Sequence, residues 1–341
     1  MVMRLVALAA LAACIVSCNS QDAPQDVQGP ITVEDIANAT PLTSSESTID
    51  SLVLKYAKGD VFRYRAVQIS TGGVDTAFME QRSMHIYTKR VRNVRGDGTF
   101  EIGMTFDTIM VDVKATNKRT GQVIQEQHFT SADSAQRNDP AFSQFGALIG
   151  EEVTIILRPN ATIQEISGVS SIVNKIIGNQ IVPEEARAQF ARQIEMAAYA
   201  SFVEQEYLRF PATGLDSTGG WSTSSTAPIL NNIFTASSTA RYTIAGVKKV
   251  KGRRIADVSA TLSGTVTTGA IPKNASLRVT MGKSEIIGNG NTIVDVEQGY
   301  TILKTTELTT DLQATVTNTA TNQSQNMAQR TSMRTTVQLI R

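Results

Sequence analysis

The chain has 341 residues and a formal net charge of +1, from 32 Lys and Arg against 31 Asp and Glu. A charge balance this close to neutral supplies no long-range attraction for nucleic acid, which excludes a non-specific DNA or RNA binder. Two His and two Cys, with both Cys in the first 18 residues, leave too few ligands for a transition-metal site, so we expect no metal and no cofactor.

Residues 1–17 are typical of a signal peptide. A positively charged start is followed by an uncharged apolar run over residues 5–16, which is too short to anchor the chain across a bilayer. A small residue then precedes Cys18, which resembles the site at which bacterial lipoproteins are cleaved and lipidated. Cys14 is an equally good local match, but cleavage there leaves an apolar run below the usual minimum of roughly 7 residues. We therefore predict that Cys18 carries the lipid; the alternative is an ordinary cleaved signal with an incidental Cys.

Lipidation predicts a membrane-anchored protein, because two or three acyl chains hold a protein far more firmly than one. Asn19 follows Cys18, whereas an Asp at this position retains bacterial lipoproteins in the inner membrane. The sequence thus resembles that of an outer-membrane lipoprotein. The folded part is expected on either the periplasmic side or the cell-surface side of that membrane. Residues 18–50 are polar and contain no aromatic side chain, so we expect the lipidated Cys to be followed by a flexible tether.

After residue 50, two-residue alternation of apolar and polar side chains predicts antiparallel strands with one dry and one wet face. Apolar residues hold even positions over 100–106 and odd positions over 109–113, and this phase shift predicts a β-bulge near Asp107 and Thr108. Runs rich in Gly predict tight turns between strands, among them residues 288–291 with the sequence Gly-Asn-Gly-Asn.

The middle of the chain has a helical pattern. A short helix is predicted over residues 170–177, and a second, of about 25 residues, begins after Pro183, because Pro is favoured at a helix start. The apolar face of the second helix includes Phe190, Ile194 and Phe202.

The predicted fold is mainly β, with long antiparallel strands in two related curved sheets or a half-barrel and a central helical segment. The first β half covers residues 51–168, the helical segment 169–210 and the second β half 211–341. A weak repeat supports two related halves, since residues 91–96 and 247–252 have similar sequences before a long strand.

Residues 52–64 contain the turn Lys58-Gly59-Asp60 before an aromatic strand. This segment is similar to the first hairpin of an uncharacterised domain-of-unknown-function family of β-rich bacterial secreted proteins and lipoproteins, of a Bacteroidota-like kind. Residues 96–98 and 298–300 match further motifs, whereas Gly219-Gly220-Trp221 departs from a Gly-Asp-Ser-Trp-like run. The resemblance implies architecture and location, and it lends no catalytic residues because the family has no established activity.

Sequence patterns for catalysis are absent: there is no Gly-x-Ser-x-Gly elbow, no phosphate-binding Gly-rich loop and no His-Glu-x-x-His. In the pairs Glu151-Glu152 and Glu184-Glu185, adjacent side chains point in different directions, so we expect a strand edge and a helix start instead of an acid/base pair. His85 and His128 are expected to be strand residues. The chain is therefore predicted not to be an enzyme; the alternative is an envelope hydrolase with an unrecognised carboxylate site.

The predicted function is a non-enzymatic binding or scaffold role in the outer envelope. A curved sheet with a helix across its open side can hold a lipid or another apolar molecule, and Phe190, Ile194 and Phe202 form the candidate ligand face. The alternative is that the helix covers a solid core, and Trp221 is expected to be a core residue. The expected partners are the membrane, through the lipid anchor, and a lipid or an envelope protein.

Overall fold

The computed structural model describes residues 30–37, 39–42, 47–74, 77–178, 180–211, 214–216, 219–229, 233–270 and 276–340. The predicted signal peptide, Cys14 and the predicted lipidation site Cys18 lie outside these residues. Residues 31–341 form one compact unit.

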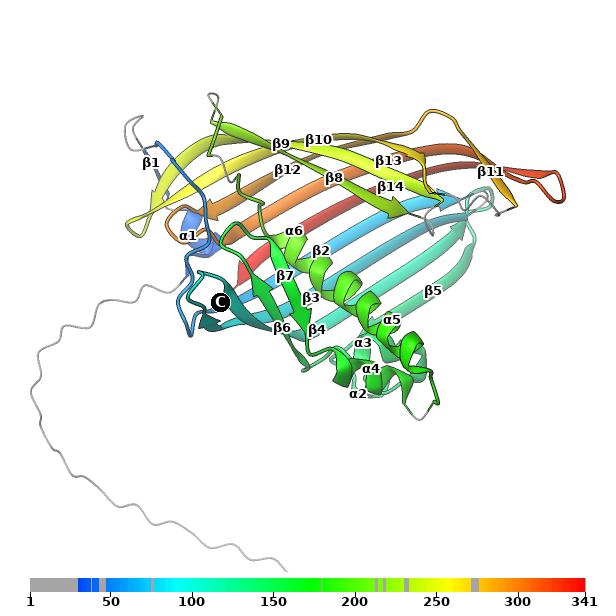
Figure 1. The fold of residues 1–341 in the computed structure, drawn as a ribbon, viewed down its shortest axis with the longest axis horizontal. Coiled ribbons are helices and arrows are strands. Elements are labelled where there is room, and N and C mark those ends of the chain that lie inside the picture. Colours follow the sequence, from blue (N-terminus) through cyan, green and yellow to red (C-terminus); the bar gives the residue numbers. More distant parts are fainter. Residues whose placement is uncertain are drawn as a thin grey trace, which may run out of the picture. The chain divides into compact units, whose positions relative to one another are not determined.

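Within the described residues, fourteen strands make one antiparallel sheet. They are β1 (Thr40–Pro41), β2 (Val61–Val74), β3 (Ala77–Val94), β4 (Phe100–Asn117), β5 (Val123–Thr130), β6 (Glu152–Leu157), β7 (Ile163–Ser167), β8 (Gly220–Ile229), β9 (Phe234–Val250), β10 (Arg253–Thr268), β11 (Leu277–Met281), β12 (Glu285–Asp295), β13 (Thr301–Asn318) and β14 (Gln323–Ile340). The strand order is β1-β9-β10-β12-β13-β14-β2-β3-β4-β6-β7, with β8 on β9, β11 on β13 and β5 on β4. The sheet is curved and open, and the last strand of the chain, β14, joins its two halves by pairing with β2 (Figure 1). This confirms the mainly β prediction in its half-barrel form.

The predicted β-bulge is confirmed. Ile86 of β3 pairs with Thr108 of β4, and the next residue, Tyr87, pairs with Phe106, so Asp107 is the extra residue. Its carboxylate lies on the outer face of the sheet, where it accepts a hydrogen bond from Thr88 at 2.8 Å. The bulge changes which residues of β4 face inward, as the phase shift in the sequence indicated.

The turn predicted at residues 288–291 is wrong, because these residues lie within β12. A Cβ atom on Gly288 would lie 2.6 Å from the carbonyl oxygen of Glu307, and one on Gly290 would lie 2.9 Å from that of Thr305. Both glycines therefore allow β12 to approach β13 closely, which is the other common reason for Gly in a strand.

The helices are α1 (Val33–Ile36), α2 (Ser134–Arg137), the 3₁₀ helix η1 (Pro140–Phe142), α3 (Ser143–Gly146), α4 (Ser170–Ile177), α5 (Glu184–Ile194), the π-helix η2 (Glu195–Ala200) and α6 (Ser201–Glu206). The short helix was predicted with the bounds of α4. The long helix is also confirmed, and α5, η2 and α6 make it continuous from residue 184 to 206. It runs across the inner side of the curved sheet (Figure 1). The π-helical turn in its middle was not predicted. Among the residues that the structure describes, no helix combines the length and the apolar character needed to cross a membrane.

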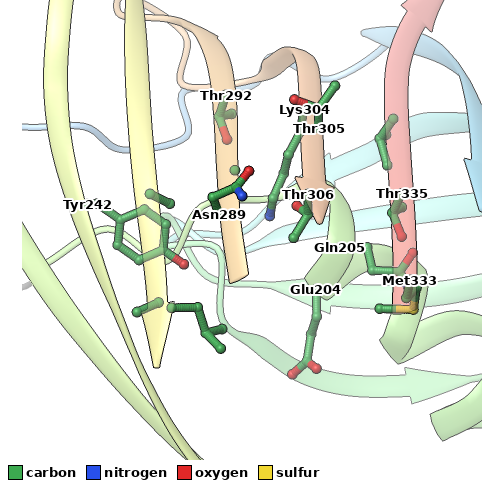
Figure 2. Close-up of a pocket in the computed structure, with 15 residues that line it drawn as sticks. Glu204, Gln205, Tyr242, Asn289, Thr292, Lys304, Thr305, Thr306, Met333 and Thr335 are labelled. Carbon is green, nitrogen blue, oxygen red and sulfur yellow. The ribbon is translucent and has the colours of Figure 1, made fainter. Parts of the chain in front are cut away.

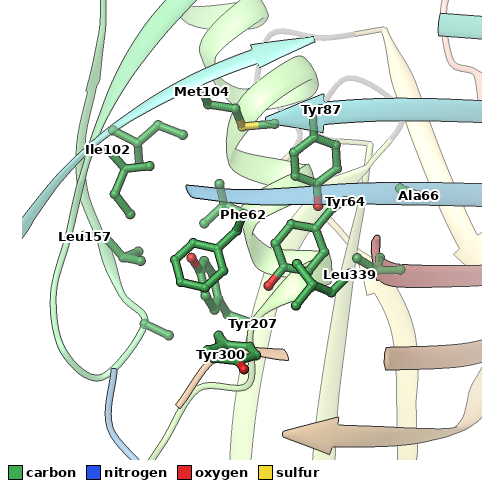
Figure 3. Close-up of a cluster of buried hydrophobic side chains, with 14 of the residues drawn as sticks. Phe62, Tyr64, Ala66, Tyr87, Ile102, Met104, Leu157, Tyr207, Tyr300 and Leu339 are labelled. Carbon is green, nitrogen blue, oxygen red and sulfur yellow. The ribbon is translucent and has the colours of Figure 1, made fainter. Parts of the chain in front are cut away.

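The main core lies between the helices and the inner face of the sheet, and it is rich in buried aromatic rings, including Phe62, Tyr64, Tyr87 and Tyr300 (Figure 3). A smaller cluster around Phe234 packs at the other end of β9 and β10.

The predicted tether differs from expectation in its second part. Ile31 is fully buried, and its backbone N–H donates to the Tyr300 hydroxyl at 2.7 Å. Ile49 is buried too, and β1 pairs with β9. The absence of aromatic residues misled the prediction, because the aliphatic side chains of this segment are enough to attach it to an existing core.

Candidate functional site

An apolar pocket lies between the long helix and the sheet. Its volume is about 300 Å³, at the lower end of the range for small-molecule sites. The structure brings together all three residues of the predicted ligand face, because Phe190, Ile194 and Phe202 line this pocket. Phe106 of β4 and Leu148, which follows α3, line it from the opposite side. The helical spacing thus identified one side of the pocket, and the fold supplies the other.

His85 of β3 also lines the pocket, with its ring centroid 4.6 Å from that of Phe202. Burial lowers the pKa of His85 to about 4, because an imidazolium ion is poorly solvated among these side chains. The imidazole is therefore neutral at pH 7. It lies in a strand, as predicted, and adds no charge to the apolar surface.

The π-helix η2 forms part of the pocket lining through Ala197 and Ala198. The fully buried Tyr199 packs its ring 5.3 Å from that of Phe106, which fixes this turn against β4. Small side chains next to that fixed ring leave space unfilled. A π-helical turn inside an α-helix is rare and often lies at a functional site.

A buried ion pair holds the end of the helix to the sheet. Glu206 of α6 is fully buried, pairs with Lys89 of β3 and accepts a hydrogen bond from the Tyr87 hydroxyl at 2.9 Å. The Lys89 ammonium also lies 4.6 Å from the centre of the Tyr64 ring and 4.3 Å from that of Tyr207. Removing either partner of such a pair strongly destabilises the folded protein, because the remaining charge would be buried without a counter-charge.

Two further hydrogen bonds link Glu206 and the following residue, Tyr207, to the same region. The hydroxyl of Thr301 donates to the Glu206 carbonyl oxygen at 2.8 Å, and the Tyr56 hydroxyl donates to that of Tyr207 at 2.9 Å. Sequence reasoning missed this network. The one available signal was Lys89 itself, which stands at an inward position of an alternating strand.

A second cavity, of about 200 Å³, lies beside the last turn of α6 on the inner face of β9 to β14 (Figure 2). Lys304 of β13 lines it and donates a hydrogen bond to the Tyr207 carbonyl oxygen at 3.0 Å. Burial lowers the pKa of Lys304 to about 8. Sequence reasoning did not identify this cavity either.

The other predicted residues lie apart from both cavities. Glu151 pairs with Lys175 and accepts a hydrogen bond from Ser171 at 2.7 Å, and Glu152 pairs with Arg92. The contacts with Lys175 and Ser171 lower the pKa of Glu151. The pair Glu184-Glu185 occupies the first turn of α5, as expected.

Trp221 is buried, as predicted. Its indole N–H donates to the Arg209 carbonyl oxygen at 3.0 Å, and its ring stacks on Tyr242 at 5.0 Å. His128 lies in β5, as predicted, where it is exposed and contacts Asp112.

Comparison with known proteins gives a family match. The model of a family of unknown function (DUF6263) matches residues 97–301. No curated protein matches the chain.

Similar solved structures differ strongly in sequence. A structure of lipovitellin, described for its lipid–protein interactions, has 7% identity and a TM-score of 0.43, covering 84% of this chain and 26% of that one. A COG4313 outer membrane channel from Pseudomonas putida F1 has 6% identity and a TM-score of 0.23, covering 84% of this chain and 97% of that one. The chain spans about a quarter of the lipovitellin chain, and overlaps at these TM-scores carry no functional conclusion.

Proposed function

We propose a function for this chain on the premise that it belongs to the DUF6263 family, whose own function is unknown. The protein is an outer-envelope lipoprotein that holds an apolar molecule, such as one acyl chain, in the pocket between the long helix and the sheet. Its role is binding and not catalysis.

The observation that carries this proposal is the composition of the pocket. Aromatic and aliphatic side chains from both the helix and the sheet make up most of the lining of about 300 Å³, which also includes the amides Gln144 and Gln193. The one titratable side chain that lines it, His85, is neutral at pH 7. Apolar molecules gain free energy by leaving water for such a surface, whereas a charged substrate would lose its hydration without compensation. The volume suits a single chain and not a complete phospholipid.

The proposed location rests on the N-terminal sequence. The packed unit begins at Ile31, 13 residues after Cys18. A stretch of this length spans at most about 45 Å. A lipid on Cys18 would therefore keep the folded unit close to the membrane from which an apolar ligand would come.

Native mass spectrometry of the full-length protein, gently extracted from its own membranes, tests the proposal. We expect a co-purified apolar molecule at a fixed stoichiometry. Ala198→Trp should fill the pocket and remove that mass, whereas Met196→Trp is the matched control because Met196 is 65% exposed in the same turn. Circular dichroism checks that both variants fold. A ligand-free wild-type spectrum, or full occupancy in folded Ala198→Trp, would overturn the proposal.

The competing function, an envelope hydrolase, makes a different prediction. It requires turnover of an ester, glycoside or peptide substrate that a carboxylate variant abolishes. Glu151 is engaged with Lys175 and Glu152 with Arg92. We therefore expect no turnover, and activity that disappears in Glu151→Gln would favour the hydrolase instead.

A further inference from the structure

The second cavity differs in chemistry from the pocket beneath the helix. Ala260, Leu262 and Val337 supply apolar surface. Polar groups also line it, among them Lys304, Thr335, Asn289 and the carboxylate of Glu204 (Figure 2). Its volume of about 200 Å³ is below the usual range for a whole ligand of drug size. It therefore suits a small molecule.

Lys304 brings an incompletely satisfied positive charge to this cavity. Lys304 is half-buried, and of the three donors of its ammonium group one is used in the bond to the Tyr207 carbonyl oxygen. The nearby carboxylates have other partners. Glu206 is bound by Lys89 and Tyr87, and the Glu204 carboxylate accepts from Arg209 at 2.6 Å. Glu206 therefore contacts Lys89 directly and acts on Lys304 only through its electrostatic field.

Thr335 supplies a second, independent observation. Its side chain is 5% exposed, and its hydroxyl oxygen is buried without a hydrogen-bond partner in the structure. Thr335 of β14 pairs with Thr306 of β13, two residues from Lys304 on the same inner face. A buried hydroxyl without a partner is destabilising, so a group that completes its hydrogen bond would be bound favourably.

We infer that this cavity binds the anionic head of a small monoanionic amphiphile, with Lys304 as its counter-ion and the Thr335 hydroxyl as a hydrogen-bond donor. A carboxylate accepts from both groups at once. The short apolar tail then lies against Leu262 and Met333. One cation and one hydroxyl match a single negative charge better than the two charges of a phosphate monoester. The inference concerns a different cavity from that of the proposed function and does not depend on it.

Isothermal titration of the full-length protein in a non-ionic detergent tests this site with octanoate as the probe and octan-1-ol as its uncharged counterpart. We expect octanoate to bind more tightly than octan-1-ol to the Ala198→Trp variant, in which the pocket under the helix is filled and neither probe can enter it. Lys304→Met should remove that preference, and Thr335→Val, which keeps the side-chain shape, should weaken octanoate binding about tenfold. Thr336→Val, on the outer face of the same strand, is the matched control and should change nothing.

The outcomes separate the two cavities. Ala198→Trp, which fills the pocket under the helix, should leave octanoate binding intact. The inference is overturned if octanoate does not bind, if it binds no better than octan-1-ol, or if Ala198→Trp abolishes binding while Thr335→Val leaves it unchanged. Should Lys304→Met fail to fold, Thr335→Val still decides the matter.

The pH dependence provides a further readout. Because burial lowers the pKa of Lys304 to about 8 and only the ammonium form attracts a carboxylate, octanoate affinity should fall as pH rises from 7 to 9. Lys304→Met should show no such fall. The other ionisable groups around the cavity are Glu204, Glu206, Lys89, Tyr207 and Tyr242. An affinity that does not change over this range in the wild type would contradict the role of Lys304.

Discussion

Replacing Glu206 by Gln should strongly destabilise the protein at pH 7. The substitution keeps the shape of the side chain and leaves a hydrogen-bond partner for the Tyr87 hydroxyl, but it removes the negative charge next to Lys89. Glu206 is fully buried and the Lys89 side chain is 2% exposed, so water cannot replace the lost charge. Removing one partner of such a pair destabilises a protein by about 3–5 kcal/mol.

The cost of deprotonating Lys89 gives an independent upper limit on this destabilisation, and its value is similar. The variant can avoid a lone buried charge by folding with Lys89 neutral. With an unfolded-state pKa of about 10.4, deprotonation at pH 7 requires about 3.4 units at 1.36 kcal/mol each, or about 4.6 kcal/mol. The unfolded chain then binds a proton that the folded variant does not bind, so stability rises with pH. Between pH 7 and pH 9 the destabilisation should shrink by up to about 2.7 kcal/mol.

Urea denaturation followed by the fluorescence of Trp221, the single tryptophan, measures both effects. Glu204→Gln is the matched control, because Glu204 lies two residues earlier and its pair with Arg209 is about half exposed. It should change stability by no more than about 1 kcal/mol. The double variant Lys89→Met/Glu206→Gln should be more stable than Glu206→Gln alone. A loss below about 1 kcal/mol at pH 7, or one that does not change with pH, would refute the reasoning.

Three further predictions follow from single residues. The folded-state pKa of His85 is about 4, so the free energy of unfolding of the wild type should fall by up to about 3 kcal/mol as pH drops from 6.5 to 4. His85→Leu should lack this fall when both proteins are compared by urea denaturation. Gly264→Ala should destabilise the sheet by about 1–3 kcal/mol, because its Cβ would lie 2.3 Å from the Ser237 carbonyl oxygen, whereas Gly246→Ala, with open space around it, should be neutral or slightly stabilising in thermal denaturation. Cys18→Ser should release the protein from membranes into the soluble fraction and Cys14→Ser should not; the reverse result would place the lipid on Cys14.

The sequence predicted those parts of the fold that depend on local periodicity. The two-residue alternation located strands and the bulge at Asp107, and helical spacing grouped Phe190, Ile194 and Phe202 on one face. Glycines were harder to interpret, since Gly288 and Gly290 serve close strand approach and not a turn. Because Gly has no side chain, its sequence does not distinguish a turn from a close approach of two strands. Only the position of the neighbouring strand does.

The candidate sites depend on contacts that no local pattern records. Lys89 and Glu206 are 117 residues apart in the chain, and neither is unusual in its own segment except that Lys89 points inward. Lys304 reaches the second cavity only because β13 lies between β12 and β14. Strand order, and not composition, therefore places the charged groups.

The long helix is attached unequally at its two ends. Its last turn is tied to β3 through the buried Glu206, whereas residues 184–189 at its start are exposed and are linked to α4 through the exposed hydrogen bond from Arg187 to Asn174. Free energies of local opening should therefore increase along the helix from α5 to α6, as amide exchange would show. We therefore expect the first turns to separate from the sheet more readily than the last turn, where the buried charges lie. For the apolar ligand proposed to lie under Phe190, the rate of entry and exit would then depend on the opening of these first turns and not on the stability of the sheet.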